Sequence, residues 1–557
     1  MRTTSVGTRG VILGQLFPRL SSAAVPQVSE LDDNEAERCW VSGAQHLVDA
    51  YWGRYVAILH DPSGDRCLIL RDPTGALPCF VTHHAGVDIY FSDMEDAARL
   101  PFLPFSINWD FVRANIMLPM YQKIITGLNE VSEVLPAECL EIASGVRSCR
   151  FLWDPYAIAA SGITEDPQAA ARELRGVVRA TIATLAGGYD RVVHNLGGLD
   201  SSIALACLTD APARPEITAI THFTPTPRGD ERAYTRAMAR HADVPLIEAE
   251  LDAARADVRR IFASNRLARP HGFFDCLGLN GHVLETADAV GAQAIFYGVG
   301  GDQVFFQPPL NMAALDHVKA HGFGRRSIAV ALEASRYGRC RVADTLAAMW
   351  RERIRPEPCY PYVSAALFRR RRLPLVEETV TEAAGYESLL HPLLRPADDM
   401  SKGKYLHILM SAFFSIEHYD HWDTAYTAER VHLFLAQPII EACLRIPTWV
   451  LTYRGIDRGL ARRAFAGDLP PMISARLSKN GPDDYYGDLY RRNVDAIRPV
   501  LVGGQLVREG ILKAGAVERA LGAADHSTYA HPPHLLGHFA TEAWIERWRQ
   551  RPSIIPL

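Results

Sequence analysis

Apolar and polar positions follow two different rhythms along the chain. Up to about residue 155, short apolar runs such as residues 55–59 and 67–70 are separated by turn-forming segments, of which residues 61–65 are typical. Apolar runs of this length, bounded by Pro, Gly and Asp, predict β-strands joined by tight turns. We therefore predict a β-rich domain over residues 1–155.

Beyond this point, apolar strands alternate with helices. Asp166 followed by Pro167 predicts the start of a helix that continues to residue 185. We then expect strands at 191–196, 216–223, 244–251 and 294–299, and helices at 201–208, 230–242 and 279–290. This alternation predicts βαβ units and a parallel sheet. Since residues 310–557 are rich in helix signals, we predict a second, α/β domain over residues 156–557 with a helical extension.

Composition narrows the class of protein. The chain has 557 residues, enough for two or three domains, and a formal net charge of −5, which gives no general case for nucleic acid or an anionic membrane as a partner. No apolar run reaches the roughly 18 residues of a membrane span. The ten cysteines form no C-x-x-C pair. We expect a cytoplasmic protein with reduced, buried thiols.

The first candidate site is the segment R-V-V-H-N-L-G-G-L-D-S-S at residues 191–202. Gly197 and Gly198 allow a sharp bend and a close approach to a ligand. The amides that follow, with Ser201 and Ser202, would open a helix N-terminus, which favours an anion. Asp200 suits an anion site if a divalent metal lies between it and a phosphate. The segment is not a Walker loop, because no lysine follows the glycines.

A second glycine-rich turn, Y-G-V-G-G-D at residues 297–302, ends the last predicted strand. Parallel strands place their carboxyl ends at one edge of the sheet, so Asp200 and Asp302 should lie close together there. Each aspartate alone also fits a helix N-cap. The pair predicts a magnesium site shared with phosphate oxygens.

Three stretches resemble known families. The first turn resembles the pyrophosphate loop S-G-G-x-D-S of ATP pyrophosphatases, and the second resembles the S-G-E-G-S-D-E-V-F segment of asparagine synthetases. The N-terminal order W-G-x-Y-V-A-x-L, L-R-D-P-x-G and F-S-D resembles their glutaminase-like domain. The chain is thereby identified as a member of the asparagine synthetase superfamily. The resemblance implies an N-terminal glutaminase-like (Ntn-type) domain and an ATP-pyrophosphatase-like synthetase domain.

The resemblance also implies a reaction and its residues. A carboxylate would attack the α-phosphorus of ATP with Mg²⁺ present, and an amine would then displace AMP. Lys479, in the segment R-L-S-K-N-G, matches the family's catalytic lysine, although a solvated loop lysine is the alternative. The metal ligands would be Asp200 and Asp302. The ATP-binding residues implied are Asn195, Leu196, Gly197, Gly198, Asp200, Ser201, Ser202, Thr221, Tyr297 and Gly298.

Several positions depart from the family pattern. Arg2 stands where glutaminases have their cysteine nucleophile, and the first cysteine is Cys39, so we expect no glutamine hydrolysis. Leu196 replaces the serine of the pyrophosphate loop, which leaves binding to backbone amides. Val299 replaces the glutamate near the incoming ammonia, where β-lactam synthetases have tyrosine. It cannot act as an acid or base; Glu417 and His418 are the candidates for that role.

The stretches L-F-L-A-Q-P-I-I-E-A-C-L-R-I-P and D-R-x-L-A-R-R-A-F-A-G-x-L-P look most like those of lasso-peptide cyclases. That likeness implies macrolactam closure between the N-terminal amine of a ribosomal core peptide and an internal Asp or Glu. A leader peptidase and a leader-binding protein would be partners. The alternatives are a β-lactam-forming or other small-molecule amide synthetase, an asparagine synthetase proper and a catalytically silent scaffold. The four arginines at 369–372 fit solvated surface, or a site for polyphosphate or an acidic peptide.

Overall fold

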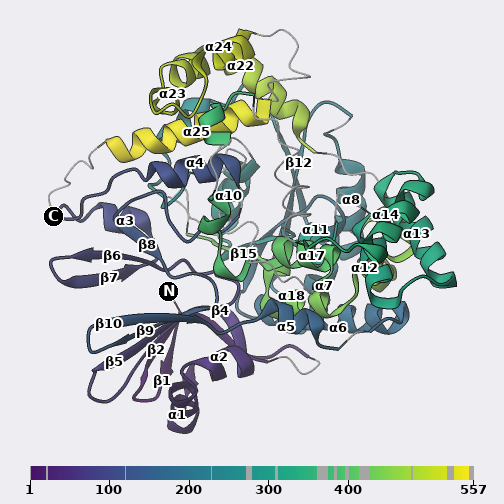
Figure 1. The fold of residues 1–557 in the computed structure, drawn as a ribbon, viewed down its shortest axis with the longest axis horizontal. Coiled ribbons are helices and arrows are strands. Elements are labelled where there is room, and N and C mark those ends of the chain that lie inside the picture. Colours follow the sequence, from purple (N-terminus) through teal and green to yellow (C-terminus); the bar gives the residue numbers. More distant parts are fainter. Residues whose placement is uncertain are drawn as a thin grey trace.

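The structure is a computed structural model. It describes residues 2–19, 23–119, 121–162, 164–227, 229–270, 279–307, 311–359, 374–381, 385–394, 400–412, 427–477, 481–522 and 532–550. The N-terminal strands, the central parallel sheet and the helical groups around it are shown in Figure 1. Of the helices in these ranges, none has the length and apolar character needed to cross a bilayer.

The N-terminal part is built on two sheets. The larger has seven strands in the order β10-β9-β5-β4-β2-β1-β3, and all its pairs are antiparallel except β1 with β3. The smaller has the order β7-β6-β8. The predicted β-rich character is confirmed. The strands are β1 (Thr3–Val6), β2 (Gly10–Pro18), β3 (Glu30–Leu31), β4 (Tyr51–His60), β5 (Arg66–Arg71), β6 (Phe80–His84), β7 (Val87–Phe91), β8 (Val131–Glu133), β9 (Glu138–Ala143) and β10 (Val146–Phe151).

Helices flank these sheets and lead into the second part. Asp166 caps the long α6 by accepting bonds from the amides of Gln168 and Ala169, with Pro167 in the first turn, as predicted. A proline tolerates this position because the amide it lacks would have no helical partner. The helices of this stretch are α1 (Asp33–Val41), α2 (Gln45–Ala50), α3 (Met94–Ala98), α4 (Trp109–Met117), α5 (Pro155–Ala160) and α6 (Pro167–Ala186).

A five-stranded sheet with the order β13-β12-β11-β14-β15 forms the centre of the second part, and every pair in it is parallel. The predicted parallel sheet is thus confirmed, and the ends of its predicted elements differ from the observed ones by at most two residues. Its elements are β11 (Arg191–Asn195), α7 (Leu199–Thr209), β12 (Glu216–Phe223), α8 (Arg232–Ala242), β13 (Leu246–Glu250), η1 (Val258–Ala263), α10 (Leu279–Ala289), β14 (Ala294–Tyr297), α11 (Gly301–Val304) and β15 (Glu429–His432).

Both faces of this sheet are covered, as parallel sheets require. Val192 and Phe296 belong to the apolar cluster that contains α6 and α7, whereas their neighbours Val193 and Ile295 belong to the cluster that contains Val283 of α10. The first cluster continues into the N-terminal sheet. The two parts of the chain therefore share one apolar core.

The fifth strand, β15, is an addition to the predicted sheet. No strand is predicted from the sequence at its residues, Glu429–His432. They pair with β14 in the register Ala294↔Glu429 to Tyr297↔His432. Four residues that begin with two charged side chains give no strand signal, and their pairing depends on a partner more than 130 residues away in sequence.

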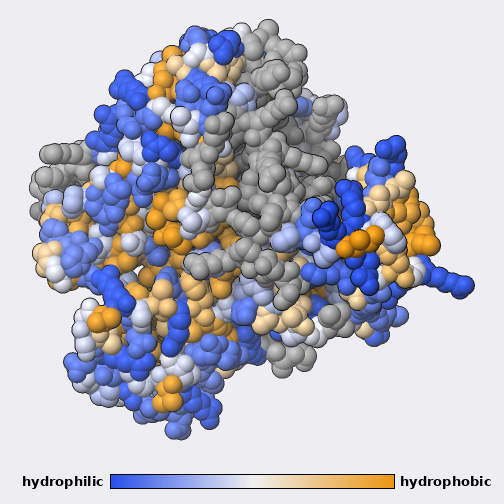
Figure 2. Space-filling model, viewed as in Figure 1, coloured by the Kyte–Doolittle hydropathy of each residue, from blue (hydrophilic) through white to orange (hydrophobic). Residues whose placement is uncertain are grey.

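Helices dominate the rest, as predicted. They are α12 (Met312–His321), α13 (Arg325–Gly338), α14 (Val342–Ile354), α16 (Glu378–Thr381), η2 (Tyr386–Leu389), η3 (Pro392–Leu394), α17 (Lys402–Ala412), η5 (Leu433–Leu435), α18 (Gln437–Arg445), α19 (Thr448–Leu451), η6 (Tyr453–Gly455), α20 (Gly459–Ala464), α21 (Pro471–Ser474), α22 (Asp483–Val502), α23 (Gln505–Arg508), α24 (Ala514–Gly522) and α25 (Pro532–Arg549). The right edge of the molecule in Figure 2 shows apolar surface over α13 and α14, where Ile328, Leu332, Trp350 and Ile354 are exposed.

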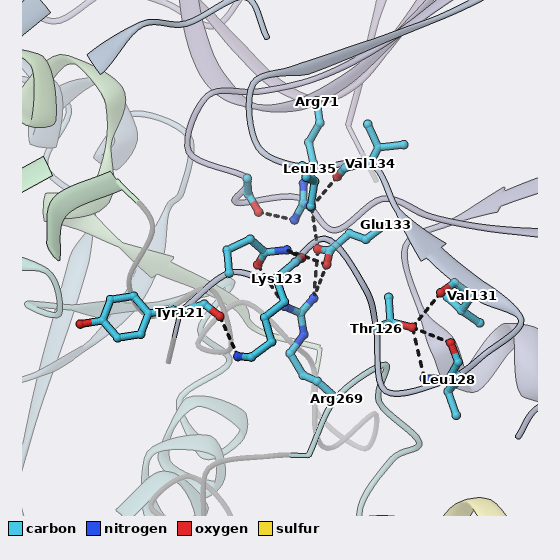
Figure 3. A network of polar contacts seen from close by, with 12 residues as sticks. Arg71, Tyr121, Lys123, Thr126, Leu128, Val131, Glu133, Val134, Leu135 and Arg269 are labelled. Carbon is cyan, nitrogen blue, oxygen red and sulfur yellow. Dashed lines mark hydrogen bonds and ion pairs between the residues drawn. The ribbon is translucent and has the colours of Figure 1, made fainter. Parts of the chain in front are cut away.

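A buried ionic network joins the N-terminal sheets to the segment that follows η1 (Figure 3). Glu133 accepts from Arg71 at 2.7 Å and from Arg269 at 2.9 Å, and Gln122 donates to it at 2.9 Å. Burial raises the pKa of Glu133, but Arg269 and Arg71 outweigh that effect and lower it to about 2. Glu133 is therefore ionised throughout the physiological range.

Candidate active site

The two glycine-rich turns meet at the carboxyl edge of the parallel sheet. Strands β11 and β14 are hydrogen-bonded neighbours, with Asn195 opposite Tyr297. A Cβ on Gly298 would lie 2.6 Å from the amide nitrogen of Ser201, and one on Gly301 would lie 2.4 Å from Cγ of Asp200. Glycine is required at position 298 because the Ser201 backbone packs against it, and at position 301 because the Asp200 side chain does.

A cavity of about 280 Å³ opens between these turns. Of the residues implied for ATP and metal, Leu196, Ser202 and Thr221 do not line it, and each is buried with at most 1% of its surface exposed. Leu196 belongs to the apolar core instead. The implied residues that do line the cavity are Asn195, Gly197, Gly198, Asp200, Ser201, Tyr297, Gly298 and Asp302.

The first turn presents the start of α7 to the cavity. Its N-cap is Gly198, so no capping side chain occupies the first-turn amides. Ser201 Oγ accepts from the Gly197 amide at 2.8 Å and donates to the Gly198 carbonyl at 3.1 Å, which closes the turn. A 2.8 Å hydrogen bond between His194 Nε2 and the Ser201 carbonyl also stabilises the turn. Open amides at the start of an eleven-residue helix form a site for an anion such as a phosphate.

Asp200 and Asp302 face one another across Arg458. The Arg458 Nη1 donates to Asp200 at 2.6 Å and to Asp302 at 2.5 Å, while Nη2 donates to Asp457 at 2.6 Å. Burial lowers the pKa of the Arg458 guanidinium, but the three carboxylates outweigh it and raise the pKa above its ordinary value. The predicted proximity of the two aspartates is confirmed, and a permanent cation lies between them.

The residues present fit a magnesium ion held jointly with phosphates. Within the described part of the chain, no group of three or more His, Cys, Asp or Glu side chains could hold a metal. The protein thus offers two carboxylates, and phosphate oxygens or waters would supply the other ligands, which is the usual arrangement for Mg²⁺. Asp200 and Asp302 would hold the ion. Its chemistry would be to neutralise charge on the phosphates.

The opposite wall of the cavity was not predicted. Arg476 donates to Glu231 at 2.5 Å, and its guanidinium lies 4.0 Å from the ring centre of Tyr234. Arg462, from α20, lines the cavity as well. In the sequence, the D-R-x-L-A-R-R stretch that supplies Arg458 and Arg462 indicates only a family likeness, since nothing in its spacing predicts that two of its side chains face the glycine turns.

Four further positions bear on the chemistry. Val299 lines the cavity and provides no acid or base there. Lys479, Glu417 and His418 lie outside the described residues, as does the arginine run at 369–372. The role of Lys479 therefore stays a prediction.

Neither Arg2 nor Cys39 provides an activated thiol in the N-terminal part. Cys39 is fully buried, and burial raises its pKa to about 12, so it is a neutral thiol at physiological pH. Arg2 donates to Gln27 and to the Gly188 carbonyl, which ties β1 to the turn before β11. Both residues thus have structural roles.

The chain matches the family described as asparagine synthase over residues 197–546, more than half of its length. The match begins at the first glycine of the β11–α7 turn and includes both aspartates. No curated protein matches the chain.

Proposed function

Because the chain belongs to the asparagine synthase family, and so forms amide bonds at the expense of ATP, we propose that its substrate is a peptide that it closes into a ring. The carboxylate would be an internal Asp or Glu of a ribosomal core peptide, and the amine its N-terminus. A leader peptidase and a leader-binding protein would deliver the core peptide. The observation that supports this choice over asparagine synthesis is Val299 in the wall of the cavity, where ammonia-using relatives have a glutamate.

The residues of the cavity, together with Lys479, would act in two successive chemical steps. The open amides of α7 and the Asp200–Asp302 pair would hold the phosphates, and the substrate carboxylate would attack the α-phosphorus to give a mixed anhydride and pyrophosphate. The amine would then displace AMP. Lys479 would offset charge on oxygen in both steps. Because the amine is tethered to the anhydride, proximity replaces part of the help that a base would give.

The test is mass spectrometry of a synthetic core peptide with enzyme, peptidase, leader-binding protein, ATP and Mg²⁺. We expect a product lighter by one water, together with AMP and pyrophosphate. An N-acetylated core peptide should still support ATP–pyrophosphate exchange but should not close. If aspartate with ammonia gives asparagine and the peptide loses no water, the cyclase proposal is wrong. Absence of any exchange would instead support a silent scaffold.

The metal assignment is tested in the same assay. Replacing Asp200 or Asp302 by Asn removes one of two metal carboxylates, and we expect a rate loss of roughly a thousandfold or more with the fold retained. The matched control is Asp210→Asn, an aspartate at the far end of the same helix α7. Near-wild-type turnover of Asp200→Asn would exclude the metal role.

A further inference from the structure

A second cavity, of about 650 Å³, lies beside the first between α6 and α20. Five arginines line it, and we name it the arginine groove: Arg172, Arg175, Arg454, Arg462 and Arg463. No acidic side chain is among its lining residues in the described part of the chain. This concentration of positive charge stands out in a chain whose formal net charge is −5.

Two of the five arginines are held by carboxylate or carbonyl oxygens of the protein. Arg175 pairs with Asp468 at 2.7 Å, and Arg462 donates to the carbonyls of Asp457 and Ser474 at 2.8 and 3.1 Å. These two contribute to the wall of the groove rather than to free binding capacity.

The other three, Arg172, Arg454 and Arg463, are exposed. Arg463 and Arg454 lie 5.0 and 5.4 Å from the ring centre of Tyr453, and Arg463 also donates to its hydroxyl at 3.2 Å. Arg454 has a φ of 61°, in the left-handed region that non-glycine residues rarely adopt. A strained backbone and two like charges beside one aromatic ring raise the free energy of the folded state. Features that reduce stability in this way are typical of binding sites.

Two carboxylates lie near these arginines without lining the groove. Asp166 is the N-cap of α6, and backbone bonds there lower its pKa, with Arg172 and Arg463 adding to the effect. Glu333 is half-buried; burial raises its pKa although Arg454 opposes this. Neither carboxylate lines the groove, so the positive charge of the groove is available to a ligand.

The groove adjoins the candidate active site and shares a wall residue with it. Arg462 lines both cavities. Leu477 lines the groove and precedes Lys479 by two residues in sequence. A ligand in the groove would therefore extend towards the position where a carboxylate is activated.

We propose that the arginine groove binds an acidic segment of the peptide substrate. Guanidinium groups match carboxylates with paired hydrogen bonds, and the apolar side chains of Tyr453, Ile456 and Leu477 suit the hydrocarbon part of a peptide. The identity of this peptide as the substrate rests on the proposed function. Binding itself needs neither ATP nor turnover.

The experiment measures fluorescence anisotropy of two labelled decapeptides, one of glutamate and one of glutamine, without ATP. The enzyme variants are a groove triple, Arg172→Glu, Arg454→Glu and Arg463→Glu, and its milder Gln counterpart. A control triple changes three exposed arginines outside both cavities, Arg240→Glu, Arg255→Glu and Arg260→Glu. Melting temperatures verify that all variants fold. Tripolyphosphate is the competing inorganic anion.

We expect the wild type and the control triple to bind the glutamate peptide and not the glutamine peptide. The groove triples should lose about tenfold or more in affinity, the Glu version more than the Gln version. Equal binding by the groove triples, an equal loss in the control triple, or binding of neither peptide overturns the proposal. Displacement by tripolyphosphate well below the peptide concentration would assign the groove to inorganic phosphates instead. None of these binding measurements depends on ring closure. A failure of the proposed function would therefore appear in the cyclisation assay and not in the binding assay.

Discussion

Arg458 lies between Asp200 and Asp302, the two residues that would hold a metal ion. Its φ of 51° places a non-glycine residue in the left-handed region, at a cost of about 1–2 kcal/mol. Only 4% of Arg458 is exposed, and the Asp200 and Asp302 side chains are 12% and 27% exposed, so a change at this position leaves two carboxylates facing each other in a partly buried site. The arginine and a magnesium ion are thus alternative counter-charges for the same pair.

Arg458→Gln should strengthen metal binding in the absence of nucleotide. The variant leaves two like charges facing each other, so Mn²⁺ measured by electron paramagnetic resonance should bind more tightly than to the wild type. Mg²⁺ should also raise the melting temperature of the variant more than that of the wild type, since a ligand stabilises the state that binds it. Arg240→Gln, an exposed arginine, is the control. Equal Mn²⁺ affinities in variant and wild type would show that the guanidinium does not compete with the metal.

At the residue scale, sequence reasoning brought the two aspartates together but missed what separates them. Asp200 and Asp302 each follow a strong local signal, a glycine turn after an apolar strand. Arg458 immediately precedes the short helix α20, more than 150 residues beyond Asp302, and its position depends on how α20 packs against α6 and α19. No local pattern encodes that packing.

At the scale of elements, the candidate active site depends on the contact between the two turns that follow β11 and β14. Strands β11 and β14 are adjacent, and the turns that follow them touch through glycine backbones. The alternation of strands and helices predicted this sheet because each βαβ unit is local in sequence. The edge strand β15 could not be predicted in the same way, since its side chains resemble those of a loop.

Gly298→Ala should damage the site while leaving the sheet folded. The new methyl group would lie 2.6 Å from the Ser201 amide nitrogen, so the start of α7 must move away from β14. Because displacements of about 1 Å at reacting groups cost roughly a hundredfold, we expect a loss of that order in AMP formation.

The matched control for this glycine is Gly176→Ala. Gly176 lies inside α6, and nothing is within 4 Å of a Cβ placed there. Alanine favours a helix interior, so the melting temperature should stay equal or rise slightly and AMP formation should not change. If Gly298→Ala retains full activity, the contact between the two turns is not needed for catalysis.

At the scale of the whole molecule, partly buried polar contacts join the N-terminal sheets to the synthetase part. Arg54 of β4 pairs with Glu429 of β15, whose other oxygen accepts from Tyr189 at 2.5 Å. Arg19 pairs with Glu441 of α18 at 2.6 Å. These contacts hold the edge strand and a helix of the synthetase part, so the N-terminal sheets contribute to its fold.

Such contacts were outside the reach of sequence analysis. The partners Arg54 and Glu429 are 375 residues apart, and Arg269 and Glu133 are 136 residues apart. Each member is an ordinary charged residue in its local segment. Only the packing of the two parts makes them neighbours, so the sequence predicted the two folds and not the contacts between them.

The ionic network around Glu133 gives the sharpest test of whether contacts between the two parts of the chain stabilise both of them. Burial favours the neutral acid, but the two arginines lower the pKa of Glu133 to about 2, below the roughly 4.5 of an unfolded glutamate. A depressed folded-state pKa stabilises the protein above the unfolded value, and that stabilisation is lost as the pH falls from about 4.5 towards 2. Glu133→Gln should lower the free energy of unfolding at pH 7 by roughly 3–5 kcal/mol, because Arg71 and Arg269 lose their charged partner in a buried site.

Urea denaturation at pH 7 and at pH 3 measures both effects. The wild type should lose stability between these values through Glu133, whereas the Glu133→Gln variant should show a smaller pH dependence over the same window. Glu37→Gln removes the partner of Arg9 from a pair in which the Glu37 side chain is 50% exposed, so its effect should stay within about 1 kcal/mol. Because Arg269 belongs to the synthetase part, the unfolding of both parts should shift together in the Glu133 variant. A shift confined to one transition would show that the network stabilises the N-terminal sheets alone.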